Sequence, residues 1–125
     1  MAKILVVDDE EKIAGIFVAF LIKKGFEVIQ VSGGEEAIAL LKSGVEIDLM
    51  ILDMKMPKVT GLDVLKARNG MKDTRPVIIV TGSMGQDKTY EDIAEFGFRR
   101  EDVVYKPVDL FLLLEEIKKR LGMKA

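Results

Sequence analysis

Five short apolar runs alternate with stretches of helical periodicity along the chain, and this alternation constrains the fold more than any other feature. The runs have the composition of strands buried on both faces, and they cover residues 4–7, 28–31, 49–52, 77–80 and 103–105. The stretches between them carry hydrophobic residues at helical spacing, which predicts helices over 13–24, 35–43, 62–69, 90–94 and 110–121. Alternating strands and helices predict an α/β fold, a doubly wound parallel sheet with helices on both faces.

The composition limits the chemistry that the chain can perform. A length of 125 residues is that of one domain, and we expect 1–125 to fold as a single unit. The chain has no cysteine and no histidine, which excludes disulfides, imidazole catalysis and zinc sites built from these residues. A net charge of −2 gives no reason to expect direct binding of nucleic acid or an anionic membrane. The apolar runs are too short for a signal peptide or a membrane span, so we expect a cytoplasmic protein.

Polar residues stand at the ends of four of the five predicted strands. Asp8 and Asp9 follow the first strand, Asp53 the third, Thr81 the fourth and Lys106 the fifth. Parallel strands present their carboxyl ends at one edge of a sheet, which is where ligands bind in open α/β folds. We therefore expect three carboxylates, a hydroxyl and an ammonium group in one pocket.

Each of these residues also has a purely structural explanation. Asp9 is suited to capping a helix, Asp53 to a solvated loop and Thr81 to a strand. Lys106-Pro107 has the form of a surface lysine before a proline that starts a helix. The structural explanations are weaker together than singly, because all of these polar residues fall at the carboxyl end of a predicted strand.

A cluster of this kind has a definite chemistry. Adjacent carboxylates raise one another's pKa unless a cation compensates them. Oxygen ligands without histidine or cysteine select a hard cation, and we expect Asp8 and Asp9 to hold Mg²⁺. A rim with Mg²⁺, an ammonium group and a hydroxyl can bind the oxygens of a phosphoryl group and neutralise charge during its transfer.

Four motifs occur in order along the chain: Val-Asp-Asp-Glu (7–10), Leu-Asp-Met-Lys-Met-Pro (52–57) with Gly61, Val-Thr-Gly (80–82) and Lys106-Pro107. In order and spacing they resemble the motifs of the response-regulator receiver domains of two-component signalling. The resemblance covers essentially the whole chain. It implies the chemotaxis-regulator-like fold, a flavodoxin-like (βα)5 sheet with strand order 2-1-3-4-5.

The resemblance further implies a role for each carboxylate. Asp53 would be the phosphoacceptor, which attacks phosphorus to form an acyl phosphate. Asp8, Asp9 and Asp53 would bind Mg²⁺ together with the backbone carbonyl of Lys55. Such a domain catalyses its own phosphorylation and dephosphorylation without being a turnover enzyme.

The other implied roles concern the phosphoryl group and its source. Thr81 would hydrogen-bond one phosphoryl oxygen, Lys106 would pair with another, and Pro107 would follow a cis peptide bond. The donor implied is a histidine kinase or a histidine phosphotransfer protein. Because the chain has no histidine, this donor is a separate protein or domain. The downstream partner, or a fused effector domain, stays open.

Three features depart from the family's pattern, all between the fourth and fifth strands. Gly82 replaces the usual alanine after the hydroxyl, the run 97–106 is about two residues longer than usual, and Val103 stands where the family has an aromatic residue. Tyr105 shares the side of Val103 and either replaces that aromatic residue or simply packs at the strand end. Lys55 either shields the phosphoryl group from water or is merely exposed.

Two other functions are compatible with parts of the sequence. Residues 82–89 differ from the phosphate-binding loop G-x-x-x-x-G-K-[ST] only at Asp87, which suggests a small nucleotide-binding protein. Against this, Asp87 puts a carboxylate where a backbone amide should contact phosphate. The second alternative is a pseudo-receiver that has the same fold and acts as an unphosphorylated interaction module. The intact polar residues at the strand ends favour the phosphoacceptor over both.

Overall fold

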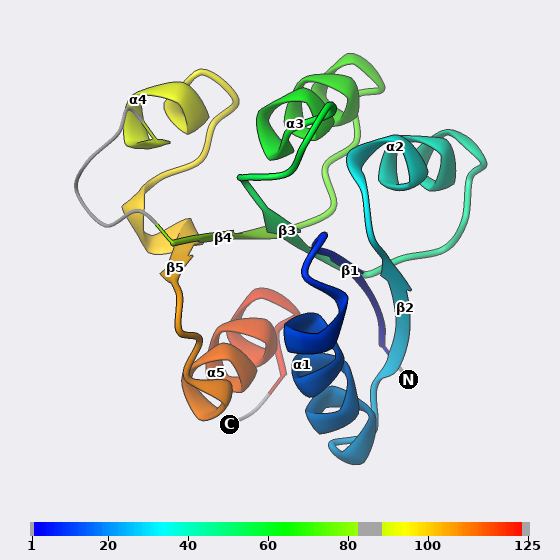
Figure 1. Ribbon diagram of the computed structural model, residues 1–125, viewed down its shortest axis with the longest axis vertical. Coiled ribbons are helices and arrows are strands. Elements are labelled where there is room, and N and C mark those ends of the chain that lie inside the picture. The colour runs from blue at the N-terminus through cyan, green and yellow to red at the C-terminus, as the bar shows by residue number, and fades with distance from the viewer. Residues whose placement is uncertain (1, 83–88, 124–125) are drawn as a thin grey trace.

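A five-stranded parallel sheet forms the centre of the computed structural model, which describes residues 2–82 and 89–123 (Figure 1). Its strands are β1 (Lys3–Val7), β2 (Glu27–Val31), β3 (Leu49–Asp53), β4 (Val77–Thr81) and β5 (Val103–Tyr105). They lie in the order β2-β1-β3-β4-β5, and each neighbouring pair is parallel. The predicted fold class and strand order are therefore confirmed. The order reverses between β1 and β3, which places the expected binding edge at the carboxyl ends of these strands.

Helices cover both faces of the sheet. They are α1 (Glu11–Lys23), α2 (Gly34–Lys42), α3 (Gly61–Gly70), α4 (Thr89–Ala94) and α5 (Leu110–Arg120). Figure 1 shows α1 and α5 on one face and α2, α3 and α4 on the other. Alternate residues of a strand point to opposite faces, so Ile4 and Val6 of β1 belong to one hydrophobic core and Leu5 and Val7 to the other. None of the helices within the described residues is long and apolar enough to cross a membrane.

Burial differs between the central strands and those at the edges. Every residue of β3 and β4 is buried, as expected for strands covered on both faces. In β2, by contrast, Val31 is buried whereas Glu27 and Gln30 are exposed, and β5 is half-buried throughout. The prediction of two-sided burial is wrong for these two strands, because they lie at the edges of the sheet and the helices cover them incompletely.

Local sequence signals set the helix ends. Thr60 caps α3: its side-chain oxygen accepts a hydrogen bond from the Asp63 backbone N–H at 3.3 Å, and the Asp63 carboxylate accepts one from the Thr60 backbone N–H at 2.9 Å. The glycine stops predicted after the first two helices are present, with positive φ angles of 96° at Gly25 and 77° at Gly44. Most predicted boundaries therefore agree with the observed ones within one or two residues.

The longer connection before the fifth strand has a defined structure. It contains a short 3₁₀ helix, η1 (Arg100–Asp102), immediately before β5. Arg120, in the last turn of α5, donates hydrogen bonds to the Glu101 carbonyl at 2.7 Å and to the Asp102 carboxylate at 3.1 Å. The connection is therefore held against the end of α5.

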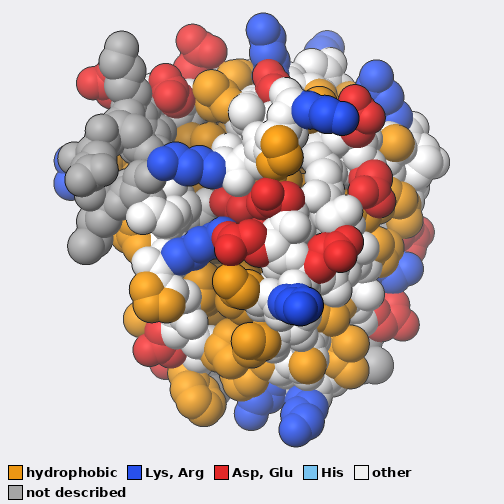
Figure 2. Space-filling model, viewed as in Figure 1, with side chains coloured by type: hydrophobic (Ala, Val, Ile, Leu, Met, Phe, Trp, Pro, Cys, Tyr) orange, Lys and Arg blue, Asp and Glu red, His pale blue; other side chains and the backbone are white. Residues whose placement is uncertain are grey.

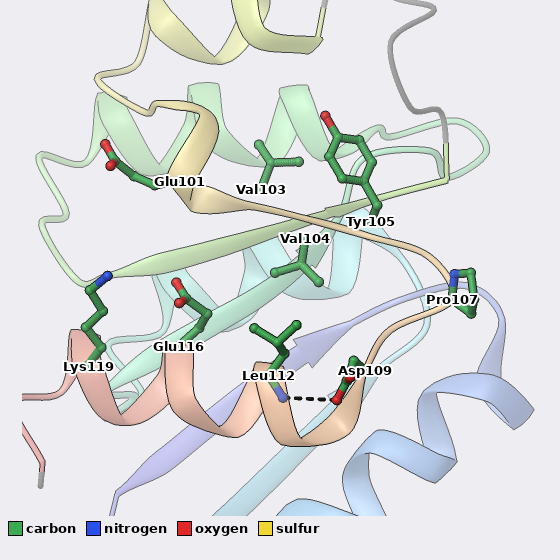
Figure 3. A pocket seen from close by; sticks show the side chains of 9 residues that line it. All are labelled: Glu101, Val103, Val104, Tyr105, Pro107, Asp109, Leu112, Glu116 and Lys119. Atoms are coloured by element: carbon green, nitrogen blue, oxygen red, sulfur yellow. Dashed lines mark hydrogen bonds between the residues drawn. The ribbon is translucent and has the colours of Figure 1, made fainter. Parts of the chain in front are cut away.

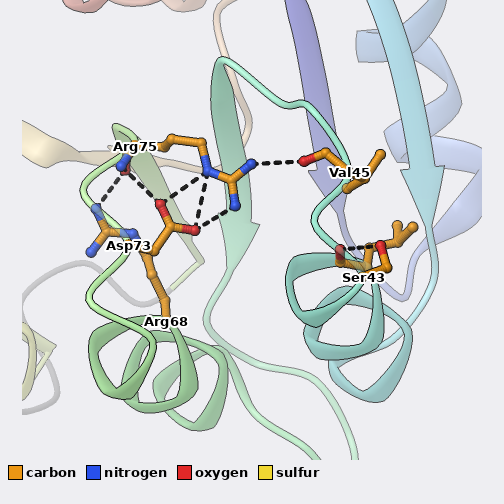
Figure 4. A network of polar contacts seen from close by, with 6 residues as sticks. Ser43, Val45, Arg68, Asp73 and Arg75 are labelled. Carbon is orange, nitrogen blue, oxygen red and sulfur yellow. Dashed lines mark hydrogen bonds and ion pairs between the residues drawn. The ribbon is translucent and has the colours of Figure 1, made fainter.

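A polar network joins α3, the start of β4 and the loop before β3 (Figure 4). The Arg75 guanidinium contacts the Asp73 carboxylate, with Nη2 2.6 Å from Oδ2, and Nη1 donates to the Val45 carbonyl at 2.9 Å. Arg68 donates to the Arg75 carbonyl from the last turn of α3. The Asp73 side chain is only 8% exposed. Hydrogen bonds from Arg75 hold the pKa of the Asp73 carboxyl below its ordinary value of 3.8.

We expect Asp73→Asn to lower the free energy of unfolding at neutral pH by about 1–3 kcal/mol, because it removes a buried acceptor of charge-assisted hydrogen bonds. The folded-state pKa of Asp73 is lowered, so its stabilisation is present above 3.8 and is lost as the pH falls through the folded-state pKa. Urea unfolding should therefore show a difference in unfolding free energy between the wild type and Asp73→Asn that becomes smaller as the pH falls. Glu115→Gln, at an exposed position of α5, is the control. An equal gap at all pH values would contradict the assignment.

Candidate functional site

Three carboxylates and one ammonium group meet at the carboxyl edge of the sheet. Asp8 follows β1 and Asp53 ends β3, and each is only 2% exposed. Glu10 lies just before α1, and one oxygen from each of the three carboxylates lies within 4.8 Å of the others. In Figure 2, acidic side chains gather near the centre of the visible face, next to a basic one. Among the described residues, this is the acidic group that geometry suits to a cation.

Lys106 supplies the positive charge at this cluster. Its Nζ lies 2.9 Å from Glu10 Oε1, 3.3 Å from Asp53 Oδ2 and 3.6 Å from Asp8 Oδ2. The Lys106 backbone N–H donates to the Thr81 carbonyl at 2.9 Å, which continues the pairing of β4 with β5 beyond the last paired residues. The end of the sheet thus fixes the backbone from which the ammonium group reaches the acids.

The surroundings of the cluster raise the pKa of both the acid Asp53 and the base Lys106. Burial, followed by repulsion from Asp8, raises the pKa of Asp53 from its ordinary value of 3.8 to about 6, although Lys106 opposes this. Burial alone would lower the pKa of Lys106. The hydrogen bond to Glu10 and the charges of Asp53 and Asp8 outweigh it, so the pKa of Lys106 is raised. The ammonium group is therefore retained, and the acids still carry more negative charge than it neutralises.

Backbone groups orient the two buried carboxylates. Asp8 Oδ1 accepts a hydrogen bond from the Glu10 N–H at 2.9 Å, and Asp53 Oδ1 accepts one from the Lys55 N–H at 3.3 Å. In each case the other oxygen, Oδ2, faces Lys106. Gly61 is required beside them, because a Cβ on it would lie 2.5 Å from the Asp53 carbonyl oxygen. The start of α3 can therefore lie directly against the backbone of Asp53.

The structure brings together only some of the residues that the sequence placed in one pocket. Asp8, Asp53 and Lys106 meet, and Thr81 ends the neighbouring strand β4 with 1% exposure. Asp9 is exposed and lies outside the carboxylate group. It is also not the helix cap, since Glu10 occupies the N-cap of α1 without a side-chain hydrogen bond.

Glu10 is the member of the cluster that sequence reasoning missed. The sequence places it in the Val-Asp-Asp-Glu motif, but two acids stand nearer to the end of the strand. A signal for it was available: Glu10 is a third acid directly after Asp8 and Asp9, at the same strand end. The donor set itself suits Mg²⁺, since it consists of carboxylate oxygens without histidine or cysteine.

The remaining predicted positions lie around this centre. Lys55 and Gly82 are exposed, and the Lys106–Pro107 peptide bond is cis. Val103 and Tyr105 point to the same side of β5, away from α5, whereas Val104 points toward α5 (Figure 3). These residues line a groove of about 400 Å³ between β5 and α5. Tyr105 is half-buried, as is Val103, and the predicted sharing of one side is confirmed.

The nucleotide-binding alternative depended on residues 82–89. Of this segment, 83–88 lie outside the described residues, and Thr89 begins α4. The well-defined acidic cluster lies instead at the ends of β1 and β3.

Comparison with known proteins decides the family. The sequence model of the response regulator receiver domain matches residues 4–118. The chain belongs to this family. Receiver domains are parts of two-component response regulators, which work with histidine kinases.

Named relatives and solved structures agree with this assignment. Response regulator RR06 of Streptococcus pneumoniae is 38% identical over 115 residues, which are 92% of this chain and 51% of the relative. SaeR of Staphylococcus aureus is 34% identical over 107 residues, 86% of this chain and 45% of the relative. The receiver domain thus spans about half the length of these curated relatives.

Two solved structures illustrate the similarity of fold. A CheY-like receiver protein from Methanospirillum hungatei superimposes with a TM-score of 0.86 at 28% identity, over 98% of this chain and 94% of that one. A receiver protein from Clostridium thermocellum gives a TM-score of 0.84 at 32% identity, over 98% and 95% of the two chains.

The raised pKa of Asp53 gives the receiver domain a specific pH dependence when metal is absent. The folded protein binds the proton of the Asp53 carboxyl more tightly than the unfolded chain does. Protonated Asp53 therefore stabilises the fold fully below pH 3.8, and this stabilisation is lost as the pH rises through about 6. We expect Asp53→Asn to lack this loss and to exceed the wild type in unfolding free energy at pH 7, by at most about 3 kcal/mol. Urea unfolding in chelator across this range measures it. Identical pH profiles for the two proteins would contradict the prediction.

Proposed function

We propose that this receiver domain accepts a phosphoryl group on Asp53, from a partner histidine kinase or histidine phosphotransfer protein, with Mg²⁺ bound beside it. The observation that carries the proposal is a buried carboxylate with an ammonium group 3.3 Å away and two further acids around it. Membership of a family whose proteins serve two-component signalling supports it. An ionised carboxylate needs no general base, and it gives a labile acyl phosphate suited to a reversible signal.

In the transfer, an Asp53 oxygen forms a bond to phosphorus while the phosphorus–nitrogen bond of a phosphohistidine breaks. The electron pair of that bond returns to the imidazole nitrogen, which leaves with the partner. Lys106 is placed to neutralise one phosphoryl oxygen, since its Nζ already lies beside Asp53. We assign the Thr81 hydroxyl to a second oxygen, because this buried residue ends the strand next to β3.

The cation would be held by Asp8 and Asp53, by the Lys55 carbonyl and by Asp9, the exposed acid that follows Asp8. Bound Mg²⁺ supplies positive charge to the phosphoryl oxygens as charge develops on them. Asp8 keeps its orientation through the Glu10 N–H, independently of any cation. Glu10 contributes in a different way, because it holds the Lys106 ammonium group in place at 2.9 Å.

The surface beside the site suits a protein donor. An apolar hollow of about 470 Å³ lies next to Lys106 and Glu10, with Ile13, Phe17 and Leu110 among its lining residues. Hydrophobic side chains cover this part of the face in Figure 2. A partner that presents a phosphohistidine can bury apolar area there while its imidazole reaches Asp53. We place this encounter in the cytoplasm, and we propose that residues 1–125 form one domain that acts on a downstream partner or a fused effector domain.

Intact mass after incubation with a small phosphoryl donor and Mg²⁺ tests the assignment. We expect the wild type to gain one phosphoryl group, and Asp53→Asn or chelator to abolish the gain. Asp92→Asn, at an exposed position of α4, is the matched control and should behave as the wild type. A folded protein that binds Mg²⁺ yet gains nothing, from the small donor or from a phosphohistidine protein, would instead indicate an unphosphorylated interaction module.

Lys55 offers a second test of the phosphoryl site. It is exposed and lies two residues beyond Asp53, and we propose that its charge and bulk hinder the attack of water on the acyl phosphate. Lys55→Ala should shorten the phosphoryl lifetime by about two- to fivefold, the effect expected of one exposed charge. Lys66→Ala, an exposed lysine of α3, is the control. An unchanged lifetime in Lys55→Ala would overturn this role.

A further inference from the structure

The first turn of α2 lies directly against the loop that follows Asp53. Gly34, the first residue of α2, is buried against Val59. A Cβ added to Gly34 would lie 2.6 Å from the Val59 carbonyl oxygen, 2.6 Å from its Cγ1 and 2.9 Å from its Cβ. Real Cβ atoms essentially never come so close to other heavy atoms, and one of the three contacts is with backbone. Only glycine allows this approach.

The loop that Gly34 contacts has an uncommon conformation. It runs from the end of β3 to the start of α3, and Lys58 within it has a φ of 65°. The Val59 N–H donates to the Pro57 carbonyl at 2.8 Å, which closes a three-residue turn around Lys58. A lysine with positive φ in such a turn is strained, and the conformation persists only where its surroundings hold it.

Several contacts hold this loop, and α2 provides the one at Val59. Met56 is buried in the core with 6% exposure. Gly61 lets the other end of the loop lie against the backbone of Asp53. Between them, Pro57 and Lys58 are exposed, so Gly34 is the support on the far side of the strained turn.

A side chain at position 34 would displace the loop rather than the helix. Ala37 and Leu41 bury one side of α2 in the core, with exposures of 0% and 6%. Shifting α2 would disturb this core packing. In the loop, Met56 is buried and Val59 packs against the core, but Pro57 and Lys58 between them are exposed, so this segment yields more easily than α2.

We propose that Gly34 is a positioning residue for the phosphorylation site, although it touches neither Asp53 nor a bound group. By allowing α2 to support Val59, it fixes the loop that carries the Lys55 carbonyl and the Lys55 N–H that orients Asp53. The inference rests on the proposed Mg²⁺-dependent function. It adds that the start of α2, which supplies no ligand, sets the geometry of the cation site through one close contact.

The neighbouring glycine provides a matched control. Gly33 has an extended backbone, with φ −157° and ψ 161°, that any residue adopts. A Cβ there would meet nothing nearer than a Glu36 side-chain oxygen at 4.0 Å. Gly34→Ala and Gly33→Ala are thus the same chemical change at adjacent positions, one obstructed and one open.

Calorimetric titration with MgCl₂ measures the effect on the cation site. We expect Gly34→Ala to bind Mg²⁺ about tenfold more weakly than the wild type, as for other residues that orient metal ligands, and Gly33→Ala to stay within about twofold. In metal-free protein, amide exchange at Val59 should be faster in Gly34→Ala alone, because the turn hydrogen bond is loosened.

The outcomes separate the inference from the proposed function. A wild type that binds no Mg²⁺ and takes up no phosphoryl group overturns both. A folded Gly34→Ala with wild-type Mg²⁺ affinity, even at lower thermal stability, overturns only the inference. Should Gly34→Ala fail to fold, Val59→Ala removes the same support from the loop side, and we then expect about threefold weaker Mg²⁺ binding. Wild-type affinity in that variant would equally overturn the inference.

Discussion

Mutual repulsion among the carboxylates at the edge of the sheet is the constraint on which the rest of this site depends. Asp8 and Asp53 are almost completely buried, so water cannot screen their charges. The Lys106 ammonium group, placed among three acids, makes this arrangement tolerable in the folded chain. The remaining negative charge favours the binding of a divalent cation. Such a cation could in turn neutralise the oxygens of a phosphoryl group.

The sheet makes the arrangement possible. β1 and β3 are neighbours at the point where the strand order reverses, so Asp8 and Asp53 leave the sheet side by side. β4 and β5 continue the same edge and bring Thr81 and the backbone of Lys106 to it. Two separate hydrophobic cores fix these strands from both faces, whereas the Arg75–Asp73 network stabilises the opposite end of the sheet. Stability and chemistry are thus carried by different ends of the same strands.

Much of this was predictable from the sequence, because alternating strands and helices permit few topologies and parallel strands align their ends. That logic identified Asp8, Asp53 and Lys106. It missed what depends on contacts between distant segments, since Glu10 joins the cluster, and it overestimated the burial of the two edge strands. The contact of Gly34 with Val59 was likewise invisible, because nothing in a glycine reveals what approaches it.

The long reach of Lys106 also bears on how the site comes into being. Its partner Glu10 is 96 residues away in the sequence, and Asp53 is 53 residues away. During synthesis on the ribosome, the acids therefore emerge well before their counter-charge. A nascent chain that lacks the fifth strand holds carboxylates that Lys106 does not yet compensate. Pairing of β5 with β4 closes contacts between segments far apart in the sequence, so the cluster is complete only when the whole sheet has formed.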